Sequence, residues 1–293
     1  MEIQYINREN NCKEVEKVYG DKLIKFIYTN SIGKLACDAL KNPIFSKFYG
    51  KWQNTSFSNK KIEKFVDQYD INLDDYLPEV INEGAIPYSN FNNFFIRKFK
   101  PGKRIFSSEN NNMPAFSEAR YFGYPKVLES ERYPVKGKFL SSEGILADER
   151  WSSEFKNGPM LIARLCPVDY HRFHFPDDGK VIDSYRISGD YHSVNPVALK
   201  NKADIFLKNE RHVSILETKN FGLIAYVEVG AMCVGKIIQS YDDNYFNRGD
   251  EKGYFLFGGS TVIVLGQQGL WSPSKDIVDN TNNGLETLIK LGD

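Results

Sequence analysis

The chain has 293 residues, of which 41% are hydrophobic, 14% aromatic and 26% charged, so it can bury a large core and is neither disordered nor fibrous. Lys and Arg together number 38, as do Asp and Glu, so no overall charge directs the protein to nucleic acid. The four cysteines form no Cys-x-x-Cys pair, which argues against a disulfide scaffold or a zinc ribbon and favours a reducing cytosol.

The hydropathy pattern predicts neither export nor a membrane span. Met1 leads into polar residues 7–11, without the basic and then apolar order of a secretory signal. The longest apolar stretch, 221–238, contains Glu228, Lys236 and three glycines. We therefore interpret it as two β-strands rather than a membrane helix.

The first third of the chain predicts helices. From Lys13 to about Asp70, apolar residues recur every three or four positions, and short helices are expected at 31–41, 43–52 and 58–70. Ser58 is the expected N-cap of the last helix. One apolar face then follows at Ile62, Phe65, Val66 and Tyr69.

Two segments of this region have compositions that suit a membrane surface. Residues 42–52 interleave aromatic side chains with lysines, which is typical of a membrane interface or of a helix packed on the body of the protein. Residues 94–104 carry five basic residues and no acidic one. They predict either a surface that faces anionic lipid or a solvated connector.

After Arg104 the sequence changes to short apolar runs separated by Gly, Pro, Asn and Asp. Runs at 159–165, 213–216 and 223–229 predict strands of a mainly antiparallel sheet, and 280–291 predicts a closing helix. No strand-helix alternation is present, which disfavours Rossmann-like and (β/α)₈ folds. The predicted class is α+β, with a helical region over 1–104 and an antiparallel, barrel- or sandwich-like body over 105–293.

Two of the four histidines lie in residues 167–176, directly after a predicted strand. Between two prolines, this loop carries Asp169, His171 and His174. Such a composition is expected at a functional site rather than in a core. One alternative is a surface loop whose histidines satisfy local hydrogen bonds. Another is that one histidine serves as the general base for a hydroxyl elsewhere in the chain.

A metal site is a further alternative for the same loop. Its ligands would be Cys166, His171 and His174, with His192 or His212 as a fourth. The spacing of these residues matches no zinc pattern, so we expect no metal.

The sequence Gly258-Gly259-Ser260-Thr261 separates two apolar runs and predicts a strand, a tight turn and a second strand. The two glycines favour a hairpin turn or a bulge. A hydroxyl after two glycines can also approach the preceding carbonyl, because Gly259 has no Cβ and both glycines tolerate unusual backbone angles. Ser260 is therefore a candidate nucleophile.

These two motifs, Gly258-Gly259-Ser260-Thr261 and residues 169–176, resemble those of the pyruvoyl-dependent phosphatidylserine decarboxylases. Other segments are similar to the family in the same order: 91–98, 135–137, 193–196, 209–211, 229–231 and 284–287. Each segment alone is weak evidence for the family, but the whole set in this order is specific to it, and the resemblance covers residues 5–293.

The resemblance implies a proenzyme that cuts itself between Gly259 and Ser260, giving chains 1–259 and 260–293. Ser260 Oγ would attack the Gly259 carbonyl to form an ester, and β-elimination and hydrolysis would leave a pyruvoyl group as the self-generated cofactor. Its ketone would form a Schiff base with phosphatidylserine, whose decarboxylation yields phosphatidylethanolamine and CO₂.

The resemblance also assigns roles to other site residues. It implies that His174 is the base that activates Ser260 and that His171 lies near the substrate. The family's supporting aspartate lies in a Ser-Pro-x-Asp-Gly segment, where this chain has Glu118 without the Pro and Gly. We expect Glu118 to replace it, although the carboxylate role falling to Asp169 or Asp177 and a loss of processing are alternatives.

The implied partners are phosphatidylserine in a membrane surface and the protein's own two cleavage chains, while a homodimer is left open and no nucleic acid is expected. We expect a peripheral membrane protein on the cytoplasmic face. Two other functions are retained: a pyruvoyl-dependent decarboxylase of a soluble amino acid, and an unprocessed, inactive lipid-binding member of the family.

Overall fold

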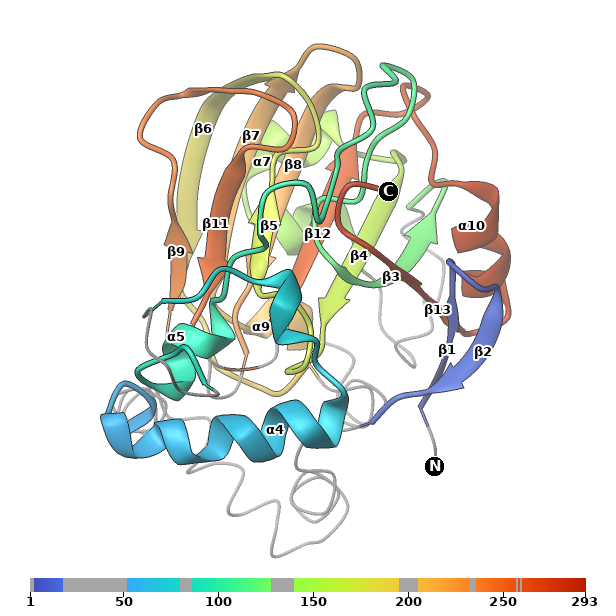
Figure 1. Cartoon of the computed structure of the whole chain (residues 1–293). Helices are drawn as coiled ribbons and strands as arrows, with labels where there is room; N and C mark the ends of the chain where they lie inside the picture. The colour runs from blue at the N-terminus through green and yellow to red at the C-terminus, as the bar shows by residue number, and fades with distance from the viewer. Residues whose placement is uncertain are drawn as a thin grey trace, which may run out of the picture.

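The computed structural model describes residues 3–17, 52–79, 86–127, 140–194, 205–231, 236–256, 258 and 260–293 (Figure 1). The helix expected at 31–41 and nearly all of the aromatic and lysine-rich segment 42–52 lie outside these ranges. Within them, strands dominate, and they form two sheets with short helices around them. The fold is therefore mixed, with an antiparallel-dominated sheet, as expected.

The larger sheet has ten strands in the order β10-β6-β7-β8-β12-β4-β3-β13-β1-β2. Their bounds are β1 Gln4–Asn7, β2 Cys12–Val15, β3 Ala119–Tyr124, β4 Met160–Leu165, β6 Gly179–Ile187, β7 Arg211–Thr218, β8 Gly222–Val229, β10 Tyr245–Phe246, β12 Ser260–Gly266 and β13 Glu286–Ile289. All neighbours are antiparallel except β1 and β13, which are parallel. The sheet is open at β10 and β2, so it is not closed into a barrel.

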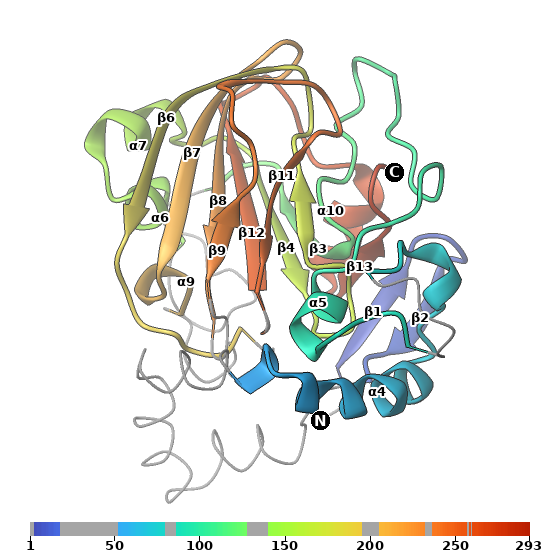
Figure 2. The ribbon, with the colours of Figure 1, turned by 60° about the vertical axis from the view of Figure 1, so that its left-hand side comes forward.

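The smaller sheet has three antiparallel strands in the order β5-β11-β9: β5 Arg172–His174, β11 Glu251–Phe255 and β9 Ile237–Gln239. It faces the larger sheet, as Figure 2 shows for β9 and β11, and the ring of Phe173 in β5 lies 6.1 Å from that of Tyr226 in β8. The predicted strands on both sides of Gly258 are confirmed as β11 and β12. The hairpin interpretation is wrong, because β12 pairs with β4 and β8 while β11 pairs with β5 and β9.

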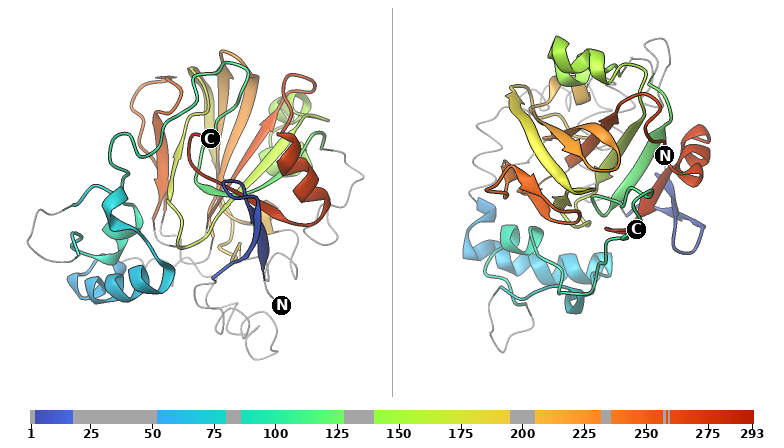
Figure 3. Two further views of the ribbon diagram at one scale, coloured as in Figure 1. Left: turned by 45° about the vertical axis from the view of Figure 1, so that its right-hand side comes forward. Right: turned by 90° about the horizontal axis from the view of Figure 1, so that it is seen from above.

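The helices are short and lie at the ends and sides of the sheets (Figure 3). They are η1 Ser56–Lys61, α4 Ile62–Tyr69, η2 Leu73–Asp75, α5 Phe91–Phe95, α6 Ser142–Leu146, α7 Glu149–Glu154, α9 Ile205–Lys208 and α10 Lys275–Asn282. The apolar face predicted for α4 is confirmed, since it packs against Phe91, Phe94 and Phe95. Ser58 is not an N-cap: it lies inside η1, and its buried hydroxyl accepts from Phe91 N at 2.9 Å.

The helix predicted from Lys13 is wrong at its start, because residues 12–15 form β2. Asn11 adopts a left-handed conformation, with φ of +54°, and turns the chain from β1 into β2. The apolar spacing was misleading there, since Val15 is exposed at the end of an edge strand. A continuous helical layer over 1–104 is accordingly not what the described residues form.

The closing helix predicted at 280–291 is also wrong. The helix α10 ends at Asn282, and Gly284, with φ of +71°, leads into β13. Leucines spaced as on a helix lie here in a strand that completes the sheet between β3 and β1. Backbone pairing with two neighbours therefore overrides the local periodicity.

A buried ion pair connects the two sheets. The ammonium of Lys252 in β11 is fully buried and donates to Glu228 Oε1 in β8 at 2.6 Å and to Gln239 Oε1 in β9 at 2.7 Å. It also donates to Ser214 Oγ in β7 at 2.9 Å. Each hydrogen of the ammonium therefore has an acceptor, which a buried charge requires.

We predict that Glu228→Leu alone costs about 3–5 kcal/mol of unfolding free energy, because it leaves the Lys252 charge buried and unpaired. The double variant Glu228→Leu, Lys252→Met should lose less than this single variant. Urea unfolding in a Ser260→Ala background, which the resemblance implies is uncut, measures both. A double variant that is less stable than Glu228→Leu would contradict this account of the pair.

Candidate active site

Ser260 is the first residue of β12 and is fully buried. It is in register with Leu165 at the end of β4, so the two strands bring Ser260 beside the residues that follow β4. Gly258 has φ of +145°, a backbone conformation that favours glycine. Gly259, the other residue of the expected cleavage site, lies outside the described residues.

His171 is the histidine that lies beside this serine. Its Nδ1 is 3.4 Å from Ser260 Oγ, and its Nε2 is 2.9 Å from the carbonyl oxygen of Cys166. A carbonyl oxygen only accepts, so Nε2 carries the proton and donates it to Cys166. The lone pair of Nδ1 consequently faces the Ser260 hydroxyl, which is the arrangement that a proton acceptor needs.

The surroundings of His171 keep its imidazole neutral. Complete burial and the nearby Arg97 charge lower the pKa of His171 to about 3. The ring of Phe95 in α5 stacks on the imidazole with 3.8 Å between centroids. At neutral pH the ring is therefore uncharged and shielded from water, and it holds a single tautomer.

His174 points away from this pair. Side chains alternate along a strand, so His174 projects from the face of β5 opposite to Phe173, whose ring faces Tyr226 between the sheets. His174 Nδ1 lies 2.9 Å from the Gly249 carbonyl oxygen, and Nε2 is buried without a hydrogen-bond partner among the described residues. The structure therefore brings His171, not His174, to Ser260.

Glu118 is held by an arginine instead of a histidine. Its carboxylate accepts from Arg104 Nε at 2.5 Å and from Arg104 Nη2 at 2.9 Å, and Oε2 is 3.4 Å from the backbone N of Leu291. These are its hydrogen bonds within the described part of the chain. The carboxylate thus neutralises Arg104 and does not reach the imidazole of His171 or of His174 in this arrangement.

The basic segment 94–104 does not form one charged surface. Arg97 is only 2% exposed and donates from Nη2 to the carbonyl oxygens of Val168 at 2.9 Å and Asp169 at 3.2 Å. Arg104 pairs with Glu118, as described above. The interpretation that this whole segment faces lipid or solvent is therefore wrong for its two arginines, because buried carbonyl and carboxylate oxygens bind them.

The loop 167–176 is more buried than its composition suggested. Tyr170 to Phe175 are buried, and three of them form β5. Asp177, a second carboxylate considered for the site, accepts from Arg248 Nη2 at 2.9 Å and from Asn220 N at 2.7 Å. Among the described residues, no group of three or more His, Cys, Asp or Glu side chains is placed to hold a metal ion.

Sequence reasoning missed the residues that enclose His171. Phe95 was part of a segment similar to the family, but nothing in the sequence assigned it a ring partner. Arg97 was counted with a surface charge cluster. Its single signal was its position just after the aromatic residues of α5.

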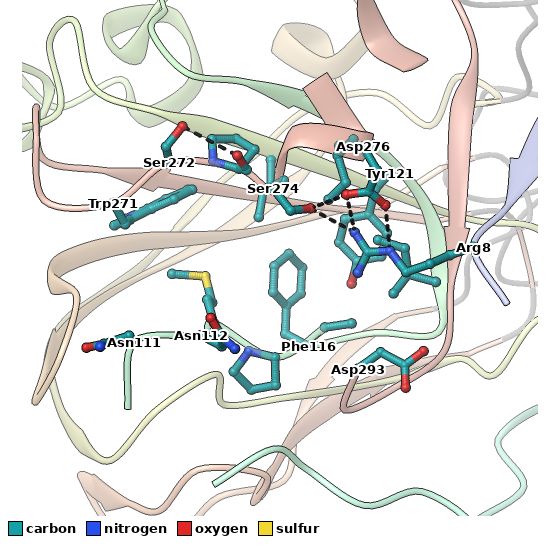
Figure 4. Close-up of a pocket in the computed structure, with 17 residues that line it drawn as sticks. Arg8, Asn111, Asn112, Phe116, Tyr121, Trp271, Ser272, Ser274, Asp276 and Asp293 are labelled. Atoms are coloured by element: carbon teal, nitrogen blue, oxygen red, sulfur yellow. Dashed lines mark hydrogen bonds and ion pairs between the residues drawn. The ribbon is translucent and has the colours of Figure 1, made fainter. Parts of the chain in front are cut away.

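A separate pocket of about 360 Å³ lies beside α10 (Figure 4). Its lining includes Phe116, Tyr121 and Trp271, with the ion pair of Arg8 and Asp276 at one side. None of the four candidate site residues lines it. This pocket is therefore distinct from the Ser260 site.

The fold and this site define a class of protein: a two-sheet β scaffold in which a buried serine, at the start of a central strand, lies beside a neutral histidine whose unprotonated nitrogen faces the hydroxyl. The family model for phosphatidylserine decarboxylase matches residues 91–290. The chain therefore belongs to the phosphatidylserine decarboxylase family, which confirms the resemblance noted from its motifs and places it among the carboxy-lyases.

Individual relatives agree over nearly the whole chain. The chain is 40% identical to a phosphatidylserine decarboxylase proenzyme of Clostridium kluyveri, over 99% of this chain and 97% of that protein. It is 39% identical to a protein of the same name from Clostridium perfringens, over 99% and 98%. A third, from Fusobacterium nucleatum, is 38% identical over 99% and 96%.

The buried neutral histidine predicts a pH dependence of stability. The pKa of His171 is about 3 in the folded chain against 6.5 for the ordinary group, so between these values the unfolded chain binds a proton that the folded chain does not. The free energy of unfolding should therefore fall as pH drops from about 6.5 towards 3. For this residue the slope against pH corresponds to at most one bound proton.

Urea unfolding of Ser260→Ala at a series of pH values tests this, with Ser260→Ala, His171→Gln as the comparison. In the double variant, the slope of the unfolding free energy against pH should be smaller in that window, by the equivalent of up to one proton taken up on unfolding. Equal slopes would mean that His171 is not buried in its neutral form.

Proposed function

We propose that the chain is a self-processing proenzyme that becomes a phosphatidylserine decarboxylase, with Ser260 as the nucleophile and His171 as its base. The observation that carries the proposal is the 3.4 Å approach of Ser260 Oγ to an unprotonated Nδ1 whose partner nitrogen is fixed on Cys166. The family and the proenzyme names of the relatives support the same reaction.

In this proposal His171 takes the hydroxyl proton as Ser260 Oγ attacks the Gly259 carbonyl carbon. The new C–O bond replaces the peptide C–N bond, the amine of residue 260 takes up a proton, and an ester results. β-Elimination then removes the α-proton of residue 260 and releases residue 259 as a carboxylate that keeps Oγ, which leaves a Cα=Cβ double bond. The imine form of this residue takes up water and loses ammonia, which gives a pyruvoyl group at position 260. His171 is placed to take the hydroxyl proton and to pass it to the leaving amine, because its Nδ1 faces Oγ.

The surroundings of Ser260 fit such a group. The position is fully buried at the end of a strand, and the flat faces of Phe95 and His171 stack next to it, so a small planar ketone would be shielded from water. When present, a pyruvoyl ketone supplies an electron sink for decarboxylation of a bound amino acid headgroup. The residues of the chain itself hold and shield that position.

We further propose that chains 1–259 and 260–293 stay associated after the cut. The smaller chain would contain β12, α10 and β13. Strand β12 lies between β4 and β8, and β13 lies between β1 and β3, so the larger chain pairs with both strands on both sides. Separation would require breaking four strand pairings.

His174 takes a different part in this proposal from the one that the resemblance implied. Its Nδ1 and backbone N contact Gly249 and Phe116, so it ties β5 to two neighbouring segments. Glu118 ties Arg104 to the backbone of Leu291 in the same way. We propose that both residues support the site without exchanging protons with Ser260.

The cleavage proposal is tested by intact mass and by the rate at which the uncut chain disappears. The expected product is a 34-residue fragment, since 293 − 259 = 34, with a blocked, ketone-bearing N-terminus. Ser260→Ala should remain uncut, and His171→Ala should slow the cut by at least about 100-fold, because it removes the base.

His174→Ala is the matched comparison, and it should slow the cut less than His171→Ala does. The reverse order of the two histidine variants would move the base role to His174. A wild-type chain that stays intact after prolonged incubation would instead favour an inactive lipid-binding protein. Release of CO₂ from free serine but not from phosphatidylserine would favour a soluble amino acid as substrate.

A peripheral location at a membrane surface is proposed from the lipid headgroup that the family name implies. None of the helices in the described ranges has the length and hydropathy of a membrane span. Trp52, four residues before η1, and Phe57, within η1, are 43% and 74% exposed, and Lys60 and Lys61 end the same short helix as Phe57. Exposed aromatic rings beside lysines are suited to the interface of an anionic membrane.

We predict that Phe57→Ser weakens binding to vesicles containing phosphatidylserine by roughly 10-fold, because one aromatic side chain no longer enters the interface. Flotation at moderate salt measures the bound fraction. Tyr245→Ser is the matched control, since Tyr245 in β10 is an equally exposed aromatic residue, at 72%. Equal losses for both variants would place the lipid contact elsewhere.

A further inference from the structure

Buried charged groups next to His171 take no part in the proposed reaction. The carbonyl of Cys166 that fixes the imidazole belongs to a turn formed by residues 166–169. The backbone N of Asp169 donates to this same carbonyl oxygen at 2.9 Å. One carbonyl oxygen therefore accepts from both the closing hydrogen bond of the turn and the imidazole of His171.

The side chain of Asp169 closes the turn from its other end. Its Oδ2 accepts from the backbone N of Cys166 at 2.7 Å. Both backbone polar groups of Cys166 are thus bound by Asp169, one by its main chain and one by its carboxylate. The direction of the Cys166 carbonyl is consequently fixed by a single residue, two positions before His171.

Two arginines hold Asp169 in place. Arg120 Nη1, on β3, donates to Oδ1 at 2.9 Å and to Oδ2 at 2.7 Å, and the two side chains are only 5% and 8% exposed. Arg97 binds the main-chain oxygens of Val168 and Asp169 from the other side. A buried carboxylate is stable only with such partners, because burial raises the pKa of Asp169 and the Arg120 charge opposes that rise.

We infer that Asp169, held by Arg120, is a positioning residue for His171: it fixes the turn whose Cys166 carbonyl selects the imidazole tautomer with Nδ1 open towards Ser260. The inference rests on the proposed function for the role of Ser260 and extends it. A carboxylate would here orient a catalytic histidine through a backbone carbonyl instead of contacting the ring.

The charge network behind Arg120 connects this turn with both ends of the chain. Glu16, just after β2, lies 3.4 Å from Arg120 Nε and 2.6 Å from Arg164 Nη2 on β4. Arg164 in turn pairs with Glu286 on β13. The turn that positions His171 is therefore supported by strands from the N-terminal, middle and C-terminal parts of the chain.

The chain offers a matched control for Asp169. Asp177 is also a buried carboxylate that pairs with an arginine and caps a backbone N, here with Arg248 at 2.9 Å and Asn220 N at 2.7 Å. It makes no hydrogen bond in the turn of residues 166–169. Loss of Asp177 should lower stability in a comparable way without changing the direction of the Cys166 carbonyl.

The first measurement is the tautomer of His171 by nitrogen-15 NMR of histidine-labelled, uncut Ser260→Ala. The chain has four histidines, so each signal can be assigned by a substitution. Ser260→Ala should show His171 protonated at Nε2 alone. Adding Asp169→Ala should give a mixture of tautomers, while adding Asp177→Ala should leave the His171 signal unchanged.

The second measurement is the cleavage rate of folded protein with Ser260 present. Asp169→Ala should slow the cut on the order of 10-fold or more, as loss of base positioning requires. Asp169→Asn keeps an oxygen for Cys166 N, so it should be faster than Asp169→Ala. Arg120→Lys keeps the positive charge and should be faster than Arg120→Met, whereas Asp177→Ala should cut at the wild-type rate.

An unchanged His171 tautomer in the Asp169→Ala background would overturn the inference, and so would equal changes for Asp169→Ala and Asp177→Ala. The tautomer is read in a chain that cannot cut, so it does not depend on the proposed function. If His171→Ala cut normally while Asp169→Ala still shifted the tautomer, the base assignment would fail and the positioning of His171 would stand.

Discussion

Strand β12 is hydrogen-bonded to β4 on one side and to β8 on the other, and every residue from Ser260 to Gly266 is buried. This constraint determines the site, because the strand begins at Ser260. The nucleophile is consequently placed by backbone pairing rather than by a loop. Leu165, its partner in register, ends β4, and the turn that follows brings His171 to the hydroxyl.

Burial changes the character of each polar group around that hydroxyl. His171 lies under the ring of Phe95 with both nitrogens directed at oxygens, so it is neutral and has one tautomer. Arg97, Arg120 and Arg164 are buried too, and each binds carbonyl or carboxylate oxygens of the same region. In such surroundings a charge is retained where oxygens that accept hydrogen bonds or carry the opposite charge lie next to it.

The sequence predicted most of the central strands and singled out Ser260 and the histidine loop, but not how the strands connect. Strands β4, β7 and β8 were expected because their β-branched and aliphatic runs lie between turn residues. The pairing of β11 and β12 with other strands was not predictable, since a glycine pair between two apolar runs favours a local turn. Strands β2 and β13 had helical spacing, which the hairpin of β2 with β1 and the long-range pairing of β13 with β3 overrode.

In the site, too, the features that depend on neighbouring residues were predicted, and those that depend on contacts between distant segments were not. Ser260 and the histidine pair were found from their motifs, whereas the choice between His171 and His174 depends on which face of an extended segment each one occupies. A spacing of three residues places the two rings on opposite sides once the segment is a strand. Glu118 aligned with a family aspartate, but its contact with Arg104 depends on a loop whose course the sequence does not reveal.

Because β11 and β12 lie in different sheets, a cut in the peptide chain between them would have little effect on the hydrogen bonds of either sheet. Among the described residues these two strands share no ladder hydrogen bonds, so severing their link would remove none. Each new end would remain anchored in its own sheet, one by the pairing of β11 with β5 and β9 and the other by the pairing of β12 with β4 and β8. A cut at this link would therefore leave the strand pairing of both sheets intact.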